Sequence, residues 1–166
     1  MSGWHEWLGD VPTWITTIAV IIAAVQYFGE RKRRAAEGQR EARAQATHLT
    51  AWTVTDVAGS RSYGVRVSNT SGSTFHDFRL DATIHGESPR SIELAIVPPG
   101  DYYVAYNGLD AEFTRDFARE VGEYGGWLRP YMKSDKYRVN RIQFTDNLGQ
   151  QWTTDDRAVL AEIVTH

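Results

Sequence analysis

The chain contains no cysteine among its 166 residues. This absence excludes a disulfide-stabilised scaffold and any zinc or iron–sulfur site with cysteine ligands. It is compatible with a reducing compartment but does not prove one. The composition is otherwise ordinary for a globular protein, with 42% hydrophobic and 23% charged residues. At this length we expect one folded domain with an appended segment.

Lysine and arginine are absent before Arg31, and residues 11–28 carry no formal charge. As a helix this run would be roughly 27 Å long, close to the hydrocarbon thickness of a bilayer. Tryptophans precede the run and Tyr27 and Phe28 end it, as aromatic belts at membrane interfaces do. The sequence therefore predicts a transmembrane helix over residues 11–28 after a short tail, residues 1–10. A buried or interfacial helix is the alternative.

Basic residues begin directly behind this run, whereas a secretory signal peptide carries them in front. By the positive-inside rule, the tail is predicted to lie outside the cell and everything after Gly29 in the cytoplasm. We therefore expect a single-pass protein of a bacterial cell membrane. Residues 29–48 are rich in helix formers and are predicted to continue as a basic juxtamembrane helix, or stalk. The residues expected to contact lipid headgroups or to fix the topology are Arg31, Lys32, Arg33 and Arg34.

From residue 49 onward, apolar and polar residues alternate in short runs typical of strands. The runs end in turn residues, which predicts an antiparallel, immunoglobulin-like β-sandwich over residues 49–166. One run alternates around Ile92, Leu94 and Ile96. The predicted strands are residues 49–57, 61–69, 75–85, 91–97, 102–106, 137–146, 150–154 and 158–164.

Three local features refine this prediction. The alternation of residues 137–146 changes phase, which indicates a β-bulge near residues 140–141. The sequence DNLG, residues 146–149, is typical of a hairpin turn with a left-handed glycine. Residues 107–136 form an insertion, in which apolar residues spaced by four predict an amphipathic helix over residues 110–122, followed by a loop. The predicted fold class is thus mainly β, with an N-terminal transmembrane helix, a basic helical stalk and a sandwich with one short helical insertion.

An apolar N-terminal run, an arginine-rich helix and the segments VSNTSGSTFHDFRL, VPPG and FTDNLGQQWTTD occur in this order. In this the chain resembles a loose group of uncharacterised bacterial single-pass membrane proteins with a C-terminal immunoglobulin-like β-sandwich. The similarity covers most of the chain. It implies this architecture, and it implies no activity.

Motifs that carry chemistry are missing: we find no phosphate-binding glycine loop, no nucleophile elbow and no metalloprotease helix. An alternating outward ladder on residues 75–85 holds groups capable of acid–base chemistry, although a salt-bridged solvated sheet face is the more typical explanation. Three aspartates around residues 146–156 lack the calcium-loop pattern. We therefore predict no enzyme, no metal and no cofactor. The ladder comprises Asp77, Arg79, Asp81 and His85, and the three aspartates are Asp146, Asp155 and Asp156.

Residues 49–166 carry 12 basic and 16 acidic side chains, which disfavours nucleic acid as a partner. Tyrosine and tryptophan instead concentrate in residues 102–137, between glycines, a composition typical of recognition surfaces. The alternative is that these rings complete the core. The candidate partner-binding residues are Tyr103, Tyr106, Tyr124, Trp127, Arg129 and Tyr131.

Together these observations predict a non-enzymatic interaction module anchored in the lipid bilayer. Its cytosolic sandwich would be presented to a protein partner or to itself in a homo-oligomer. Two alternatives remain open from the sequence. One is a membrane-acting effector of the toxin or phage-defence type, and the other is an extracytoplasmic surface-binding domain with reversed topology.

Overall fold

The structure is a computed structural model that describes residues 11–58, 62–87, 90–107, 112–113 and 118–164. Within the first helix, the side chains of residues 11–19, 22, 32, 35 and 36 also lie outside this description. The chain divides into two compact units, the first ending at Glu41 and the second spanning Ala42–His166. The predicted tail of residues 1–10 lies outside the described residues.

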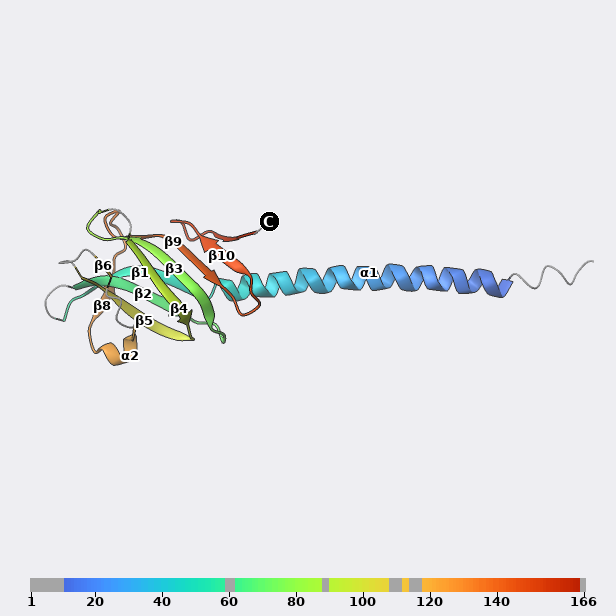
Figure 1. Cartoon of the computed structure of the whole chain (residues 1–166), viewed down its shortest axis with the longest axis horizontal. Helices are drawn as coiled ribbons and strands as arrows, with labels where there is room; N and C mark the ends of the chain where they lie inside the picture. The colour runs from blue at the N-terminus through green and yellow to red at the C-terminus, as the bar shows by residue number, and fades with distance from the viewer. Residues whose placement is uncertain (1–10, 59–61, 88–89, 108–111, 114–117, 165–166) are drawn as a thin grey trace, which may run out of the picture. The chain divides into compact units, whose positions relative to one another are not determined.

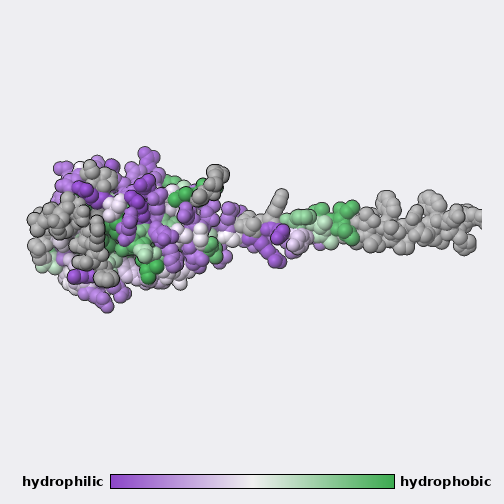
Figure 2. Space-filling view, in the orientation of Figure 1, coloured by the Kyte–Doolittle hydropathy of each residue, from purple (hydrophilic) through white to green (hydrophobic). Residues whose placement is uncertain are grey.

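Helix α1, Val11–Ala46, covers both the predicted apolar helix and most of the predicted basic helix. After its first turn it contains no proline, so the backbone hydrogen-bond ladder is uninterrupted. Glu30 and Arg34 form the expected i,i+4 ion pair at 3.7 Å. Figure 2 shows a hydrophobic stretch of α1 beside a hydrophilic one. Among the described residues, no helix is both long enough and apolar enough to cross a membrane.

The second unit is mainly β, with two antiparallel sheets consistent with the predicted sandwich (Figure 1). The first sheet, sheet A, has the order β6 (Glu112–Phe113), β5 (Gly100–Asn107), β2 (Ser62–Asn69), β1 (Leu49–Asp56) and β8 (Leu128–Pro130), and β7 (Arg119–Glu120) also pairs with β5. The second, sheet B, has the order β11 (Leu160–Glu162), β10 (Gln151–Thr154), β9 (Arg138–Thr145), β3 (Phe75–Thr83) and β4 (Arg90–Val97).

The core lies between the inward faces of the two sheets. Val65, Val67 and Val104 come from sheet A, Phe78 and Leu80 come from sheet B, and none is more than 3% exposed. Burial of each such side chain stabilises the fold by about 1.5–3 kcal/mol. The last turns of α1 add two alanines to the same cluster. The domain therefore begins within the helix, earlier than the boundary predicted at residue 49.

Two β-bulges adjust the alternation of sheet B. Between β3 and β9 the register shifts by one residue at Asn140, which confirms the predicted bulge and lets both Val139 and Ile142 contact the core. A second shift follows His76, next to Asp77, whose φ is +49°. The alternation along β4 changes phase opposite this point, so that Val97 is buried and Ile96 is 54% exposed. The prediction that Ile96 shares a face with Ile92 and Leu94 is therefore wrong.

The turn at residues 146–149 confirms its prediction, with Gly149 at φ +80°. The Asp146 carboxylate, 2% exposed, accepts hydrogen bonds from the Leu148 and Gln150 amides and the Trp152 indole, each at 2.9 Å. A buried carboxylate that accepts three donors is fully engaged in holding the hairpin. Asp146 is therefore a structural residue.

The predicted helix over residues 110–122 is wrong in the part that the structure describes. Residues 112–113 and 119–120 pair as short strands with β5, and the only helical turn among the described residues of the insertion, α2, spans Val121–Tyr124. The edge of β5 presents unpaired amide and carbonyl groups, and pairing satisfies them where a surface helix would not. The predicted loop after residue 122 likewise contains β8, which pairs with β1 at Val54–Asp56.

Candidate functional site

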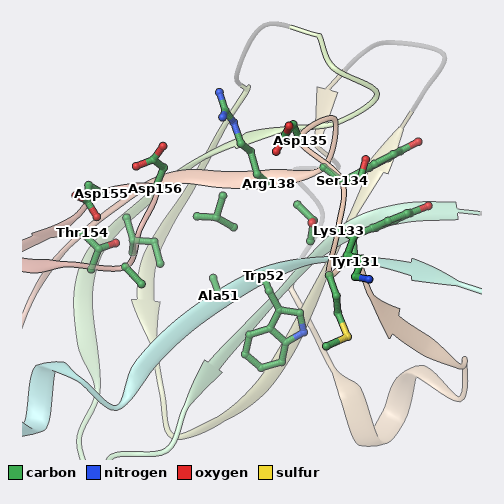
Figure 3. A pocket seen from close by; sticks show the side chains of 16 residues that line it. Ala51, Trp52, Tyr131, Lys133, Ser134, Asp135, Arg138, Thr154, Asp155 and Asp156 are labelled. Carbon is green, nitrogen blue, oxygen red and sulfur yellow. The ribbon is translucent and has the colours of Figure 1, made fainter.

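A pocket of about 340 Å³ opens between β1 of sheet A and the β9–β10 side of sheet B (Figure 3). Its volume lies at the lower end of the range for ligand-binding pockets. One wall is formed by Ala51, Trp52 and Thr53 of β1, and the opposite wall includes Val139 and Ile142 of β9. The base of the pocket therefore combines apolar and aromatic side chains from both sheets.

Charged side chains surround this base without being paired to one another. Lys133, Asp135, Arg138 and Asp156 line the pocket and are exposed. Among the residues that the structure describes, these four side chains form no hydrogen bond and no ion pair. Charges that are not committed to internal contacts remain available to a ligand.

Asp155 also lines the pocket but is used differently. Its carboxylate accepts hydrogen bonds from the Arg157 and Val159 amides at 3.0 and 2.9 Å, which closes the turn between β10 and β11. The three predicted acidic residues therefore have different roles. Asp146 and Asp155 each hold a turn, and Asp156 lines the pocket with its carboxylate unpaired among the described residues. Within the described residues, no group of three metal-ligating side chains comes together.

Beside the pocket, no strand that the structure describes pairs with the edge of β1. On this side β1 pairs with β8 only at Val54–Asp56, and one further bond joins the Tyr131 amide to the Thr53 carbonyl at 3.0 Å. Backbone groups of alternate residues point to the same edge of a strand. The amide and carbonyl of Ala51 therefore point into the pocket, since they lie two residues before Thr53.

Two of the predicted partner-binding tyrosines are buried. Tyr103 is 2% exposed and donates its hydroxyl to the Tyr63 carbonyl at 3.2 Å. Burial is the largest cause that raises the pKa of Tyr103 to about 12. Tyr106 is 7% exposed and donates to the Glu87 carboxylate at 3.1 Å. Neither ring offers a partner more than a small area.

Tyr124 and Trp127 lie at the end of β1, held there by Asp56. The Asp56 carboxylate accepts bonds from the Tyr124 hydroxyl at 2.9 Å and the Trp127 amide at 3.1 Å. The Ala58 amide, followed by the Tyr124 hydroxyl, lowers the pKa of Asp56. Asp56 thus fixes the insertion against the sheet and leaves the Trp127 side chain 68% exposed. Arg129 of β8 is exposed as well.

Tyr131, the last of the predicted aromatic residues, belongs to an aromatic cluster at the pocket. Its ring stacks on Tyr137 with centroids 4.0 Å apart and planes at 5°, and Tyr63 stacks on both. The Tyr137 hydroxyl lies 2.8 Å from Nδ1 of His85. Burial, and then the neighbouring Tyr63, raise the pKa of Tyr137 above its usual value. The predicted recognition residues are therefore divided, with only Tyr131 at the pocket.

The outward ladder of acid–base candidates is engaged in structural contacts. Asp81 accepts bonds from Ser91 at 2.6 Å and from the Arg141 guanidinium at 2.8 Å. Burial raises the pKa of Asp81, but these hydrogen bonds and the arginine charges outweigh it, so the pKa lies below its usual value. The Asp77 carboxylate accepts a bond from Thr145 at 3.3 Å, and His85 belongs to the aromatic cluster. The ladder therefore has the geometry of a salt-bridged sheet face.

The predicted headgroup-contacting residues lie along α1. Arg31, Arg33 and Arg34 are exposed, whereas the side chain of Lys32 lies outside the described part. The Arg31 guanidinium lies 5.8 Å from the centre of the Tyr27 ring, a cation–π distance. In front of these arginines, large apolar side chains of α1 are also exposed: Val20, Ile21, Val25, Tyr27 and Phe28.

Sequence reasoning missed most of the pocket. Ala51, Thr53, Lys133 and Arg138 were not candidates, because they lie on two strands and a loop whose proximity only the sheet order establishes. One signal was present in the sequence. A proline inside a strand indicates an edge strand, and Pro130 lies in β8, at the edge of sheet A.

No family model matches the chain, and no curated protein or solved structure is significantly similar to it. Its resemblance to small anchored bacterial proteins stays a prediction. Functional inference for this chain therefore rests on its own residues and geometry.

Proposed function

We propose that this protein is a non-enzymatic interaction module, anchored in a bacterial cell membrane, whose cytosolic sandwich binds a protein partner or a second copy of itself. The observation that carries the proposal is the pocket, which combines an aromatic and apolar base, unpaired charges and an unpaired strand edge. Binding sites typically have this composition. The acid–base candidates, in contrast, are engaged in structural contacts elsewhere.

The strand order supports an immunoglobulin-like assignment for the sandwich. β1, β2 and β5 correspond to strands A, B and E of one sheet, and β4, β3, β9 and β10 to strands C′, C, F and G of the other. Domains of this architecture carry many unrelated functions, so the assignment supports the scaffold and leaves the activity to the site.

The membrane part of the proposal rests on α1. Val20, Ile21, Val25 and Phe28 are each more than half exposed on the described helix, where they gain nothing from burial. Such a surface is favourable in contact with lipid or with other helices. The charge-free run of residues 11–28 is the part that would lie in the bilayer, and the arginines behind it would stay on the cytoplasmic side.

Attachment is tested by placing charge in the apolar stretch. The variant Ile21→Glu/Val25→Glu should move the protein from the membrane fraction to the soluble fraction after alkaline extraction, because an ionised carboxylate at membrane depth is strongly unfavourable. Gln39→Glu/Ala44→Glu is the matched control, since it adds the same two charges at exposed positions outside the run. Extraction of the unaltered protein into the soluble fraction would refute the anchor.

The absence of cysteine allows topology to be measured with single introduced thiols. In intact cells, a membrane-impermeant maleimide should label Ser2→Cys and should label Lys136→Cys only after lysis. The opposite pattern would establish the reversed topology.

Self-association is tested by the mass of the full-length protein in mild detergent. We expect either an oligomer of defined stoichiometry or a monomer that captures a partner on crosslinking. A monomer without a crosslinked partner would argue against an interaction module. If expression of the protein stops cell growth and expression of the Ile21→Glu/Val25→Glu variant does not, a membrane-acting effector would be favoured instead.

A further inference from the structure

We propose that the pocket binds an extended peptide segment of a partner protein, which adds as a strand to the free edge of β1 beside β8. This inference rests on the proposed function, because it specifies the site and the chemistry of the partner. In this binding mode, backbone hydrogen bonds hold the peptide and pockets select its alternate side chains.

The edge of β1 supplies the backbone part of the site. β8 leaves β1 after the bond from Tyr131 to Thr53, and no other described strand takes its place beside Ala51. In an antiparallel ladder one residue exchanges both of its hydrogen bonds with its partner. A peptide residue opposite Ala51 would thus form two bonds and continue the line of β8.

The walls of the pocket supply the side-chain part. Neighbours across a ladder point to the same face, and Ala51 contacts the core. The peptide side chain opposite Ala51 would therefore point inward, toward Ile142, where a β-branched apolar residue suits the pocket. Its two flanking residues would point to the other face, the face of Trp52.

The charges indicate a direction for the peptide. Figure 3 shows Asp155 and Asp156 at one end of the pocket, Tyr131, Lys133 and Asp135 toward the other, and Arg138 between them. A strand that continues β8 runs antiparallel to β1, from the Lys133 end toward the Asp156 end. Asp156 therefore favours a basic residue near the end of the peptide, and Lys133, two residues after the last bond to β1 at Tyr131, favours an acidic residue near its start.

The same geometry disfavours a second copy of this chain as the occupant. The edge of β1 is recessed between residues 131–135 on one side and residues 154–156 and Ala158 on the other, all of which line the pocket. For two copies to pair through β1, both recessed edges would have to meet. A single extended segment enters without this obstacle.

The test is a titration of the full-length protein in mild detergent with the peptide acetyl-Glu-Thr-Val-Thr-Val-Thr-Lys-amide. On addition of the peptide, the NMR chemical shifts of the backbone amides should change at residues 50–54, 131–135 and 154–158. Two further peptides carry N-methyl groups on alternate residues, one on the odd set and one on the even set. One set should bind about tenfold more weakly or worse, because its amides face β1, while the other, facing solvent, keeps its affinity.

Protein variants provide the second measurement. Lys133→Glu should weaken binding by about three- to tenfold, as expected for loss and reversal of one exposed charge contact. Lys136→Glu is the control, because it changes the same charge in the same segment but does not line the pocket. A peptide with its terminal Glu and Lys exchanged should also bind more weakly than the parent peptide.

Four results would overturn the inference: no binding of the parent peptide, equal effects of the two N-methylated sets, insensitivity to Lys133→Glu, or the same shifts on protein concentration alone. The last result would identify a second copy as the occupant. Failure of membrane attachment leaves this titration readable, because the site lies wholly within the second compact unit. Failure of the titration with attachment intact would remove this inference alone.

Discussion

The outward faces of the two sheets have different chemistry, although both belong to one sandwich. On sheet B the outward face is charged and open. Arg79 contacts Glu93 at 3.2 Å, and Arg141 contacts Asp81 at 2.8 Å. Both arginines are about half exposed, so solvent screens these pairs and each contributes little to stability.

On sheet A the outward face is aromatic and covered. Trp52, Arg66 and Tyr103 lie side by side across three strands, and the Arg66 guanidinium stacks over Trp52 at 5.3 Å. Tyr124 of the insertion packs on Tyr103 with ring centroids 4.6 Å apart. The insertion therefore gives sheet A a second buried layer, outside the main core.

The difference shows how an insertion serves both stability and binding. The packing of Tyr124 on Tyr103 holds residues 121–127 against the sheet. Trp127 and the pocket beside Tyr131 remain accessible. Aromatic composition alone does not separate these roles. The roles depend on which ring lies over a strand and which lies beyond its edge.

The largest expected effect is the loss of the covered aromatic layer. Tyr103→Ala should lower the free energy of unfolding by about 3–5 kcal/mol, as expected for truncation of a buried aromatic side chain. Its counterpart on sheet B, Arg79→Ala, should cost about 1 kcal/mol or less. Denaturant titrations measure both, and equal losses would contradict the difference between the faces.

A smaller effect is expected beneath the same layer. A Cβ at Gly64 would lie against the carbonyl oxygen of Val104 and the ring of Tyr103. Gly64→Ala should therefore destabilise the domain by about 1–3 kcal/mol through overpacking. Gly72→Ala is the control, because no atom beyond its two chain neighbours lies within 4 Å of its added Cβ. Thermal unfolding that ranks the two variants in the reverse order would disprove this packing.

Alkaline pH should affect the covered face. The pKa of Tyr103 is raised to about 12 in the folded state, so its contribution to stability is complete below the unfolded pKa, about 10, and is lost as pH rises toward 12. Tyr103→Phe should cost about 1 kcal/mol at neutral pH by removing the bond to Tyr63. The variant should then lose less stability than the parent protein between pH 10 and 12, measured by unfolding at both limits.

Acid pH should affect the open face, with the smallest effect. Because the folded pKa of Asp81 is lowered, its contribution is present above the unfolded pKa, about 4, and is lost as pH falls through the folded value. Asp81→Asn should cost about 1 kcal/mol or less at neutral pH. The loss of unfolding free energy caused by Asp81→Asn should become smaller in high salt and in acid. A loss of stability that does not depend on salt would indicate that solvent does not screen the ion pairs of this face.

Local patterns in the sequence predicted the local structure well. The alternation of residues 61–69 places Tyr63, Val65 and Val67 inward, and the phase change before Ile142 marks the bulge at Asn140. These features depend on the period of a strand and on one inserted residue. Both can be read from neighbouring residues alone.

Features set by distant contacts could not be predicted in this way. Phe113, Phe117 and Val121 are spaced by four, as on one face of a helix. Residues 112–113 and 119–120 nevertheless pair with β5, because its free edge is nearby. The phase change that exposes Ile96 depends on the bulge at Asp77 in the neighbouring strand. In both cases the partner strand outweighed the local preference.

The sequence by itself determined the absence of cysteine chemistry, the charge-free run before the arginines, and most of the longer strands with their inward faces. Each follows from composition or from short-range periodicity. Only the tertiary structure decided which tyrosines are buried, that Asp81 and Asp146 are engaged in structural bonds, and that Ala51 faces a pocket with Lys133. The order of strands in the two sheets brings these residues together, and that order arises from hydrogen bonds and packing between segments far apart in the chain.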